Sequence, residues 1–127
     1  MTRQHWLQVI GLLGALLVVA GAFGAHSLRD RVTPERLVTW GTAVRYGMWH
    51  ILALLAVVLS RRDLTPWRWI LRAWLSGVLV FSGSLFALVI LDIGWLGAVT
   101  PAGGILLTTG WLILFRMALL NSDALEH

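Results

Sequence analysis

Four apolar segments, each about as long as a helix that crosses a lipid bilayer, account for most of the chain. They run through residues 6–25, 41–59, 69–91 and 102–120. A helix needs roughly 20 mostly apolar residues to span the hydrocarbon core. The helices of a soluble bundle would each show a polar stripe, and these segments show none. The sequence therefore predicts an all-α fold, an integral membrane four-helix bundle.

Composition and charge agree with a membrane location and narrow the class of partner. Of the 127 residues, 58% are hydrophobic and 13% are charged, whereas soluble domains have about 45–50% and about 25%. There is no cysteine, which excludes disulfides, thiolate nucleophiles and cysteine metal sites. The net charge of +4 comes from arginines that are scattered between the apolar segments. We therefore expect membrane lipid as a partner, through its anionic headgroups, and no nucleic acid.

Three Thr-Pro pairs, at residues 33–34, 65–66 and 100–101, mark the starts of three of the helices. Threonine suits the N-cap, and proline suits the first helical position because its missing N–H would be unpaired there. We expect helices at about 6–26, 34–60, 66–92 and 101–120 within a single transmembrane domain, residues 1–127. The short links between them force an antiparallel, up-down topology.

Each end of the chain also resembles a processing or cloning segment. Arg3, the apolar run after it and Ala20-Gly21-Ala22 resemble a secretory signal peptide. Residues 125–127, Leu-Glu-His, resemble the start of a vector-encoded tag, so they carry no weight in the functional reasoning.

The distribution of arginine predicts the orientation. With an even number of crossings, both termini and the link at 61–65 lie on one side. That side has Arg3, Arg61, Arg62, Arg68, Arg72 and Arg116, and the other has Arg29, Arg31, Arg36 and Arg45. Because positive residues favour the cytoplasmic side, we expect both termini to be cytoplasmic.

Small residues recur along single helix faces, where they allow neighbouring backbones to approach closely. Pairs seven apart are Gly14 and Gly21, Gly77 and Ser84, and Gly103 and Gly110. Pairs four apart are Gly11 and Ala15, Ala20 and Gly24, Ala43 and Gly47, Ala73 and Gly77, and Gly83 and Ala87. They predict tight packing within the bundle. The same faces suit a homo-oligomer or another membrane protein as partner.

Polar side chains interrupt the second apolar segment, and such groups at membrane depth usually have a partner or a task. Tyr46 and His50 are four residues apart and so share a helix face. His50 is explained either as a neutral histidine that is hydrogen-bonded to a neighbouring helix or as a ligand or proton site. The hydroxyls expected near its depth belong to Ser82, Ser84, Thr108 and Thr109. We take Arg45, Tyr46, His50, Ser82, Ser84 and Thr108 as the candidate ligand-binding residues.

Arg45 and Asp92 form a candidate ion pair. Asp92 is the only acid near a membrane core, and the helix register places it near the height of Arg45. A pair would remove two unpaired charges at once. Alternatively, the long Arg45 side chain extends to the headgroups.

The sequence offers no catalytic constellation. It lacks a His-x-x-x-His pair, a Gly-x-Ser-x-Gly elbow, a phosphate loop and paired carboxylates. His26 should lie roughly 10–15 Å above His50, too far for one metal ion. We therefore expect a protein that is not an enzyme, with no catalytic residue, no metal and no cofactor.

Four stretches together resemble a family of small four-helix membrane proteins of unknown function, the YgdD-like domain of unknown function 423. They are residues 21–28, Gly-Ala-Phe-Gly-Ala-His-Ser-Leu, then 40–50, 81–85 and 100–104, with Gly110-Trp111 beyond. The resemblance implies a bacterial inner-membrane protein and no known activity. Arg45 departs from it, because the family pattern leads us to expect an uncharged residue there. The family-motif residues it implies are Gly21, Phe23, Gly24, His26, Pro101, Gly103 and Gly104.

Three functions remain open at this stage. The first is binding of a small or lipidic ligand, or passage of a small solute, at the polar cluster around His50. The second is a structural or assembly partner of a larger membrane complex. The third is a haem protein with His26 or His50 as an axial ligand.

Overall fold

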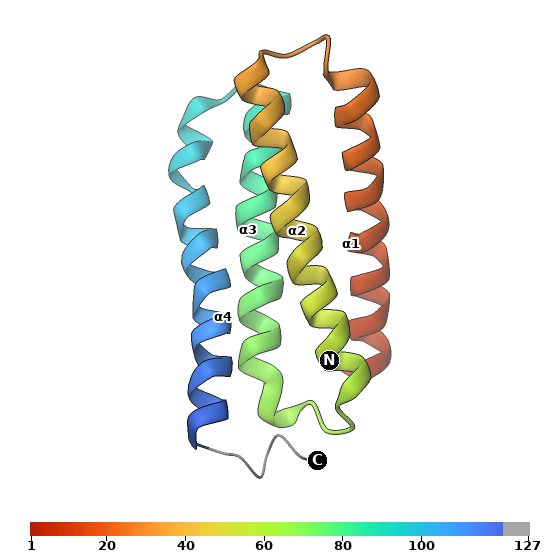
Figure 1. Ribbon diagram of the computed structural model, residues 1–127, viewed down its shortest axis with the longest axis vertical. Coiled ribbons are helices and arrows are strands. Elements are labelled where there is room, and N and C mark those ends of the chain that lie inside the picture. Colours follow the sequence, from red (N-terminus) through yellow and green to blue (C-terminus); the bar gives the residue numbers. More distant parts are fainter. Residues whose placement is uncertain (121–127) are drawn as a thin grey trace.

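The chain forms four long helices joined by short links, and the computed structural model describes residues 1–120. The helices are α1 (Arg3–Phe23), α2 (Pro34–Ser60), α3 (Arg68–Leu91) and α4 (Thr100–Leu120). Consecutive helices run in opposite directions, so α1 begins at the end of the molecule where α4 stops (Figure 1). All four are long and apolar enough to cross a membrane. The predicted all-α, four-span membrane fold is confirmed. The segment 125–127 lies outside the described residues.

The ends of the helices differ in detail from the sequence prediction. α1 begins earlier than expected because Thr2 caps it, with its Oγ1 accepting a hydrogen bond from the His5 N–H at 3.3 Å. Thr33 caps α2 in the same way. Thr65 does not cap α3: it opens a 3-10 turn, Thr65–Trp67, that leads into the helix. Thr100 is already the first residue of α4.

Two irregular turns lie at the same end of the molecule. α1 continues as a π-helical turn, Gly24–Leu28, before the link to α2. α3 ends at Asp92, which adopts the left-handed conformation with φ of 54°. Asp and Asn tolerate this conformation better than most residues. A 3-10 helix, Gly94–Ala98, then connects α3 to α4.

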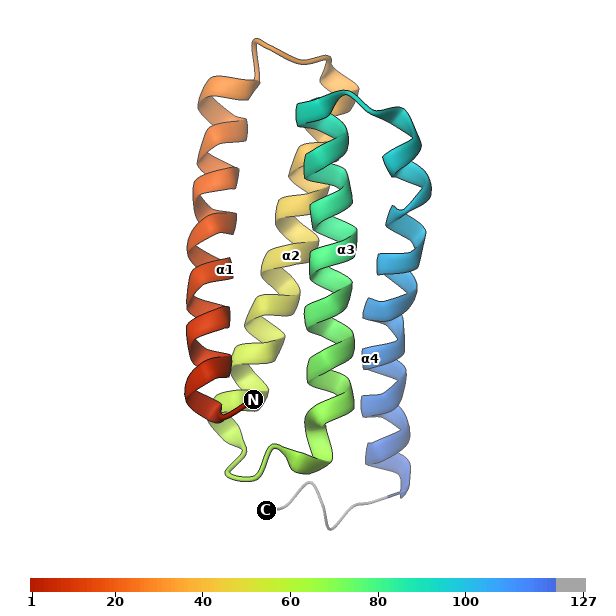
Figure 2. The same cartoon turned by 180° about the vertical axis from the view of Figure 1, so that it is seen from behind.

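Each helix packs mainly against its neighbour in the sequence. α1 contacts α2, α2 contacts α3, and α3 contacts α4 most extensively. The two opposite views show the same order, α1, α2, α3, α4, across the molecule (Figures 1 and 2). Because α2 and α4 do not pack closely on each other, and neither do α1 and α3, two lateral grooves remain open.

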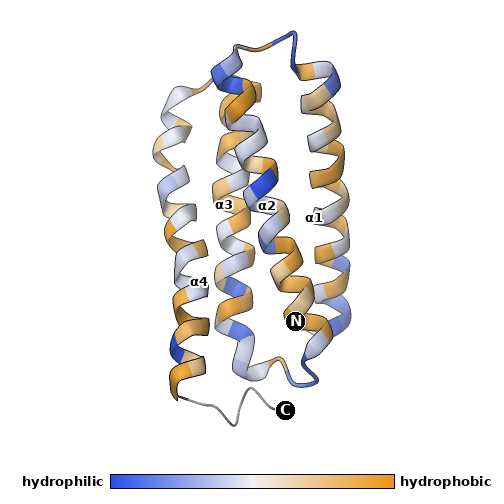
Figure 3. Cartoon of the chain, viewed as in Figure 1, coloured by the Kyte–Doolittle hydropathy of each residue, from blue (hydrophilic) through white to orange (hydrophobic). Residues whose placement is uncertain are grey.

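The apolar core has a large part and a small part. The large cluster joins all four helices, and its most deeply buried members are Leu54, Val58, Ile70, Leu71 and Trp74. A smaller cluster near the α1–α2 link contains Leu28, Trp40, Leu88 and Val89. Most hydrophilic residues lie at the two ends of the molecule, and a hydrophilic stretch interrupts α2 partway along its length (Figure 3).

Glycines sit where the helices approach most closely. A Cβ at Gly103 would lie 2.6 Å from the Phe81 Cα, and one at Gly77 would lie 2.9 Å from the Leu107 backbone nitrogen. A Cβ at Gly47 would lie 2.7 Å from Leu17 Cδ2. These small residues therefore serve contacts inside the chain. A Cβ at Gly11 or Gly83 would meet nothing within 4 Å.

Candidate functional site

His50 lies near the middle of α2 and is held on both sides of its ring. Only 5% of its surface is exposed. Its Nδ1 lies 2.7 Å from the Tyr46 carbonyl oxygen, and the Trp111 Nε1–H donates to its Nε2 at 2.9 Å. An indole N–H can only donate and a carbonyl can only accept. His50 is therefore a neutral imidazole with its proton on Nδ1, bonded to a neighbouring helix.

The partner of His50 differs from the ones that the sequence suggested. Neither Ser82, Ser84, Thr108 nor Thr109 bonds to the ring, and Trp111 on α4 does. Tryptophan in a membrane protein is expected mainly at the membrane surface. The signal that could have identified Trp111 is its place near the middle of a spanning helix, where an indole N–H needs an acceptor.

Aromatic rings surround the histidine. The Trp74 and Trp111 ring centroids are 4.6 Å apart, and both rings meet the His50 ring edge-on. Gly110 makes room for Trp74, because a Cβ there would lie only 3.2 Å from Trp74 Cε2 and closer still to other ring atoms. This cluster of three rings joins α2, α3 and α4.

The two serines of α3 belong to helix contacts. The Ser82 hydroxyl donates to the Ala43 carbonyl oxygen at 2.7 Å, which ties α3 to α2. The Ser84 oxygen lies 2.9 Å from the Phe81 carbonyl oxygen and 2.7 Å from the Thr100 hydroxyl at the start of α4. Both serines are buried. Neither of them lines the groove described next, and neither does Arg45, so these three predicted ligand-binding residues are not part of its wall.

A groove of about 650 Å³ runs along one side of the molecule between α2 and α4, with α3 beneath it. Three of the candidate ligand-binding residues, Tyr46, His50 and Thr108, line it. The family-motif residues Pro101 and Gly104 line it too. The rest of its wall is mainly apolar or hydroxyl-bearing: Thr42, Phe81, Ile105, Leu107, Thr109, Trp111 and Leu112.

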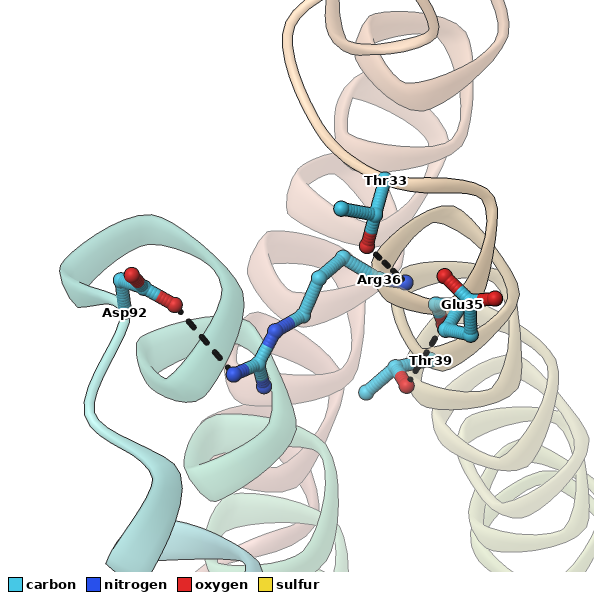
Figure 4. Close-up of polar contacts among 5 residues, drawn as sticks. All are labelled: Thr33, Glu35, Arg36, Thr39 and Asp92. Atoms are coloured by element: carbon cyan, nitrogen blue, oxygen red, sulfur yellow. Dashed lines mark hydrogen bonds and ion pairs between the residues drawn. The ribbon is translucent and has the colours of Figure 1, made fainter.

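The predicted Arg45–Asp92 ion pair is wrong. Asp92 instead pairs with Arg36, whose Nη2 lies 3.2 Å from the Asp92 Oδ1 (Figure 4). Arg36 stands in the first turn of α2, nine residues before Arg45, which is about 13 Å along a helix. The end of α3 therefore lies level with the beginning of α2. Arg45 is exposed, and its Nη2 donates to the Thr42 hydroxyl at 3.4 Å.

The motif residues near the end of α1 surround Trp40 of α2. The Trp40 indole N–H donates to the Ala20 carbonyl oxygen at 2.8 Å. A Cβ at Gly24 would lie 2.8 Å from the Trp40 Nε1, so a glycine is needed there. The Phe23 ring packs 5.8 Å from the Trp40 ring. Gly21 approaches Val44, while His26 is exposed. Within residues 1–120, no group of three His, Asp or Glu side chains could hold a metal ion.

The comparison with known protein families agrees with this architecture. The profile described as "Protein of unknown function (DUF423)" matches residues 20–104. The chain belongs to this family. The matched residues include Tyr46, His50 and the family-motif residues at the end of α1 and the beginning of α4. Thr108 and Trp111 lie beyond the matched range. The family resemblance seen in the sequence is confirmed.

Relatives in the DUF423 family are named as membrane proteins. The UPF0382 membrane protein of Staphylococcus saprophyticus is 40% identical over 110 residues, which cover 84% of this chain and 90% of the relative. YwdK of Bacillus subtilis is 38% identical over the same length, covering 84% and 89%. The relative from Haemophilus influenzae is 38% identical over 113 residues, covering 88% and 91%. No solved structure matches the chain significantly. The protein is thus a bacterial multi-pass membrane protein of a family without an assigned activity.

Proposed function

We propose that the protein is a non-enzymatic membrane protein that binds a small amphipathic, lipid-like molecule in the α2–α4 groove. The observation that carries the proposal is the groove itself, about 650 Å³ of space that opens between two spanning helices. A mainly apolar pocket with a few polar groups is the usual form of a small-molecule site. Its lateral opening suits a molecule that arrives from the surrounding lipid.

The polar groups in the groove indicate what part of the ligand they would bind. Tyr46 is 39% exposed, and its hydroxyl has no hydrogen bond within residues 1–120. A hydroxyl in hydrocarbon is costly without a partner. The Thr108 hydroxyl donates to the Gly104 carbonyl oxygen at 2.9 Å and keeps its lone pairs as acceptors. A ligand with a hydroxyl or amide near one end would satisfy both groups.

The same geometry favours binding over the passage of a proton or solute. Both ring nitrogens of His50 already have partners, so a proton relay through it would have to break the bond from Trp111. Ligation of a haem iron through its Nε2 would break the same bond. The hydroxyls of Ser82 and Ser84 are also bonded within the chain. His50 is better explained as a fixed part of the groove wall.

Native mass spectrometry from a mild detergent tests the proposal, because it reports bound molecules and stoichiometry together. Gly104→Leu fills the groove, and the site tolerates a side chain because a Cβ there would lie 3.9 Å from the Phe81 ring. Gly11→Leu on α1 is the matched control in open space. We expect the wild type and Gly11→Leu to carry a discrete extra mass that Gly104→Leu lacks. The proposal would be contradicted if Gly104→Leu retained every mass that the wild type binds, or if the wild type carried no bound mass.

A second candidate is assembly with a further copy or another membrane protein. Gly11 and Ala15 of α1 are both exposed and four residues apart, a spacing that lets another helix approach closely. In this case Gly11→Leu would lower the stoichiometry and Gly104→Leu would leave it unchanged. The same measurement therefore separates the two candidates.

We also propose that the protein lies in the inner membrane with both termini in the cytoplasm. Within residues 1–120, the end where α1 begins has Arg3, Arg61, Arg62, Arg68, Arg72 and Arg116 and one acid, Asp63. The opposite end has Arg29, Arg31 and Arg36, with Arg45 just inside, together with Asp30, Glu35 and Asp92. An excess of arginine beside the spanning helices favours the cytoplasmic side. Thiol labelling of single cysteines placed at the two ends tests this orientation.

A further inference from the structure

A second groove, at the arginine-rich end, has a composition unlike the first. It encloses about 690 Å³ between the beginning of α1 and the first half of α3. Arg3, Arg62, Arg68 and Arg72 line it, and no acidic residue among residues 1–120 does. These arginines come from α1, from the α2–α3 link and from the first turns of α3. We call this space the arginine groove.

Within residues 1–120, three of these arginines, Arg3, Arg68 and Arg72, make contacts with uncharged groups. Arg3 donates to the carbonyl oxygens of Leu59, at 3.1 Å, and Arg61, at 3.5 Å, at the end of α2. The Arg68 and Arg72 guanidinium carbons lie 5.7 and 5.3 Å from the Trp69 ring centroid. Within residues 1–120, the one ion pair within 4.0 Å joins Arg36 and Asp92, at the opposite end.

Asp63, the acid nearest in sequence to these arginines, forms no ion pair with them. Asp63 precedes α3 but does not line the groove. Its carboxylate accepts a hydrogen bond from the Thr65 N–H at 2.9 Å, which lowers its pKa. The Asp63 carboxylate is therefore ionised at neutral pH, and its hydrogen-bond partner is the backbone. Within residues 1–120, the four arginines of the groove therefore form no ion pair, and their positive charge is open to an anionic ligand.

Below the arginines, the groove becomes apolar. Arg68, Arg72, Leu75 and Leu79 follow one another at spacings of four, three and four, and therefore share a face of α3. Leu79 lies seven residues after Arg72, about 10 Å further along the helix axis. Trp6 of α1 lines the groove as well. A molecule that fits this space has an anionic head and an apolar tail.

We propose that the arginine groove binds an anionic phospholipid, with its phosphate among the guanidinium groups and an acyl chain along Leu75 and Leu79. Arginine binds phosphate through paired, charge-assisted hydrogen bonds. Arginines close to the end of a spanning helix also attract anionic lipids. A free phosphate would leave the apolar part of the groove empty. The proposal does not depend on the ligand of the α2–α4 groove.

A lipid titration followed by native mass spectrometry of the full chain tests the proposal. The probes are phosphatidylglycerol and phosphatidylcholine, which share their acyl chains and differ in net charge. The variant is the double substitution Arg68→Gln and Arg72→Gln. We expect the wild type to prefer phosphatidylglycerol. The variant should bind it about thirtyfold more weakly, because each of the two arginines near the membrane surface should strengthen binding about five- to sixfold.

Arg116→Gln is the matched control, because Arg116 is an exposed arginine of α4 at the same end and lies outside the groove. We expect it to bind phosphatidylglycerol like the wild type. Equal binding of the two lipids, or an equal loss in Arg116→Gln, would overturn the proposal. Displacement of the lipid by inorganic phosphate would also overturn it, since the site would then take the free anion.

Two further measurements keep the outcome unambiguous. Helix content by circular dichroism checks that the double variant is folded, and Arg62→Gln in the link replaces it if it is not. Gly104→Leu should leave phosphatidylglycerol binding unchanged. If Gly104→Leu abolished that binding, the lipid would occupy the α2–α4 groove and the assignment to the arginine groove would fail.

Discussion

At the scale of single residues, His50 shows how a polar group is accommodated inside a spanning segment. The Tyr46 carbonyl oxygen on its own helix and the Trp111 indole N–H on α4 satisfy both ring nitrogens. In hydrocarbon, where water is absent, each such bond replaces an unsatisfied group. The bond from Trp111 also joins two helices, α2 and α4, that otherwise leave a groove between them.

Trp111→Phe should destabilise the protein by about 1 kcal/mol, because it keeps an aromatic ring and removes the donor to His50. Trp95→Phe is the matched control, since Trp95 is 68% exposed and lies in the link before α4. The measurement is reversible unfolding in detergent, followed by circular dichroism. Equal stability of the two variants would show that the bond contributes nothing.

The residues near His50 also show how far sequence reasoning reaches. The shared face of Tyr46 and His50 follows from their spacing, and both line one groove. The partner of His50 and that of Asp92 depend on how neighbouring helices are shifted along their axes. A shift of nine residues, from Arg45 to Arg36, changes the ion pair completely. The length of an apolar segment determines the position of a helix along the membrane normal only to within a few turns, because polar residues at its ends tolerate a shift in either direction.

The Arg36–Asp92 pair should contribute little to stability. The Asp92 side chain is 84% exposed, and exposed pairs are worth about 0–1 kcal/mol. Asp92→Asn removes the charge and keeps a residue that tolerates the left-handed conformation. We expect a loss below about 1 kcal/mol that becomes smaller at high salt. Asp30→Asn, at the same end, is the control. A loss several times larger than this, independent of salt, would mean that Asp92 acts through something other than its charge.

At the scale of the helices, α3 makes the most extensive contacts, with α2 on one side and α4 on the other. It packs against α2 through Ser82 and against α4 through Gly77 and Gly103. The small-residue spacing predicts that these faces make close contacts. It does not distinguish contacts within the chain from contacts with a partner, because a glycine leaves the same gap for either. The structure shows that Gly77, Gly103 and Gly110 are used internally.

Two adjacent glycines of α4 give a direct test of this packing. A Cβ at Gly103 would lie 2.6 Å from the Phe81 Cα, part of a backbone that cannot turn aside, whereas one at Gly104 would lie 3.9 Å from the Phe81 ring. Gly103→Ala should therefore destabilise the protein by about 1–3 kcal/mol. Gly104→Ala should be neutral or slightly stabilising, because alanine is the better helix former. Unfolding midpoints of both variants in one detergent decide the question. Equal effects would place the α3–α4 contact elsewhere.

At the scale of the whole molecule, helix number and direction follow from the sequence, and lateral order does not. Four apolar segments with short links allow only an up-down arrangement. The side chains at every contact decide whether α1 also packs against α4, which would close the bundle, or whether each helix packs only against its neighbours in the sequence. Here each helix packs mainly on its neighbours in the sequence, which leaves the α2–α4 groove and the arginine groove. Four arginines line the arginine groove, and none lines the α2–α4 groove. The two grooves are therefore features that only the structure reveals.

The charge difference between the two ends leads to a prediction for the intact cell. The chain has no cysteine, so Asp30→Cys and Asp63→Cys each introduce a single thiol, in the links at opposite ends. A membrane-impermeant maleimide should label Asp30→Cys in whole cells. It should label Asp63→Cys only after the membrane is opened, because the arginine-rich end of the protein, which includes Asp63, is expected to lie in the cytoplasm. Leu52→Cys, exposed near the middle of α2, should resist labelling in both conditions, since lipid covers it. The reverse pattern would invert the orientation. Labelling of both links from one side would mean that α2 does not cross the membrane.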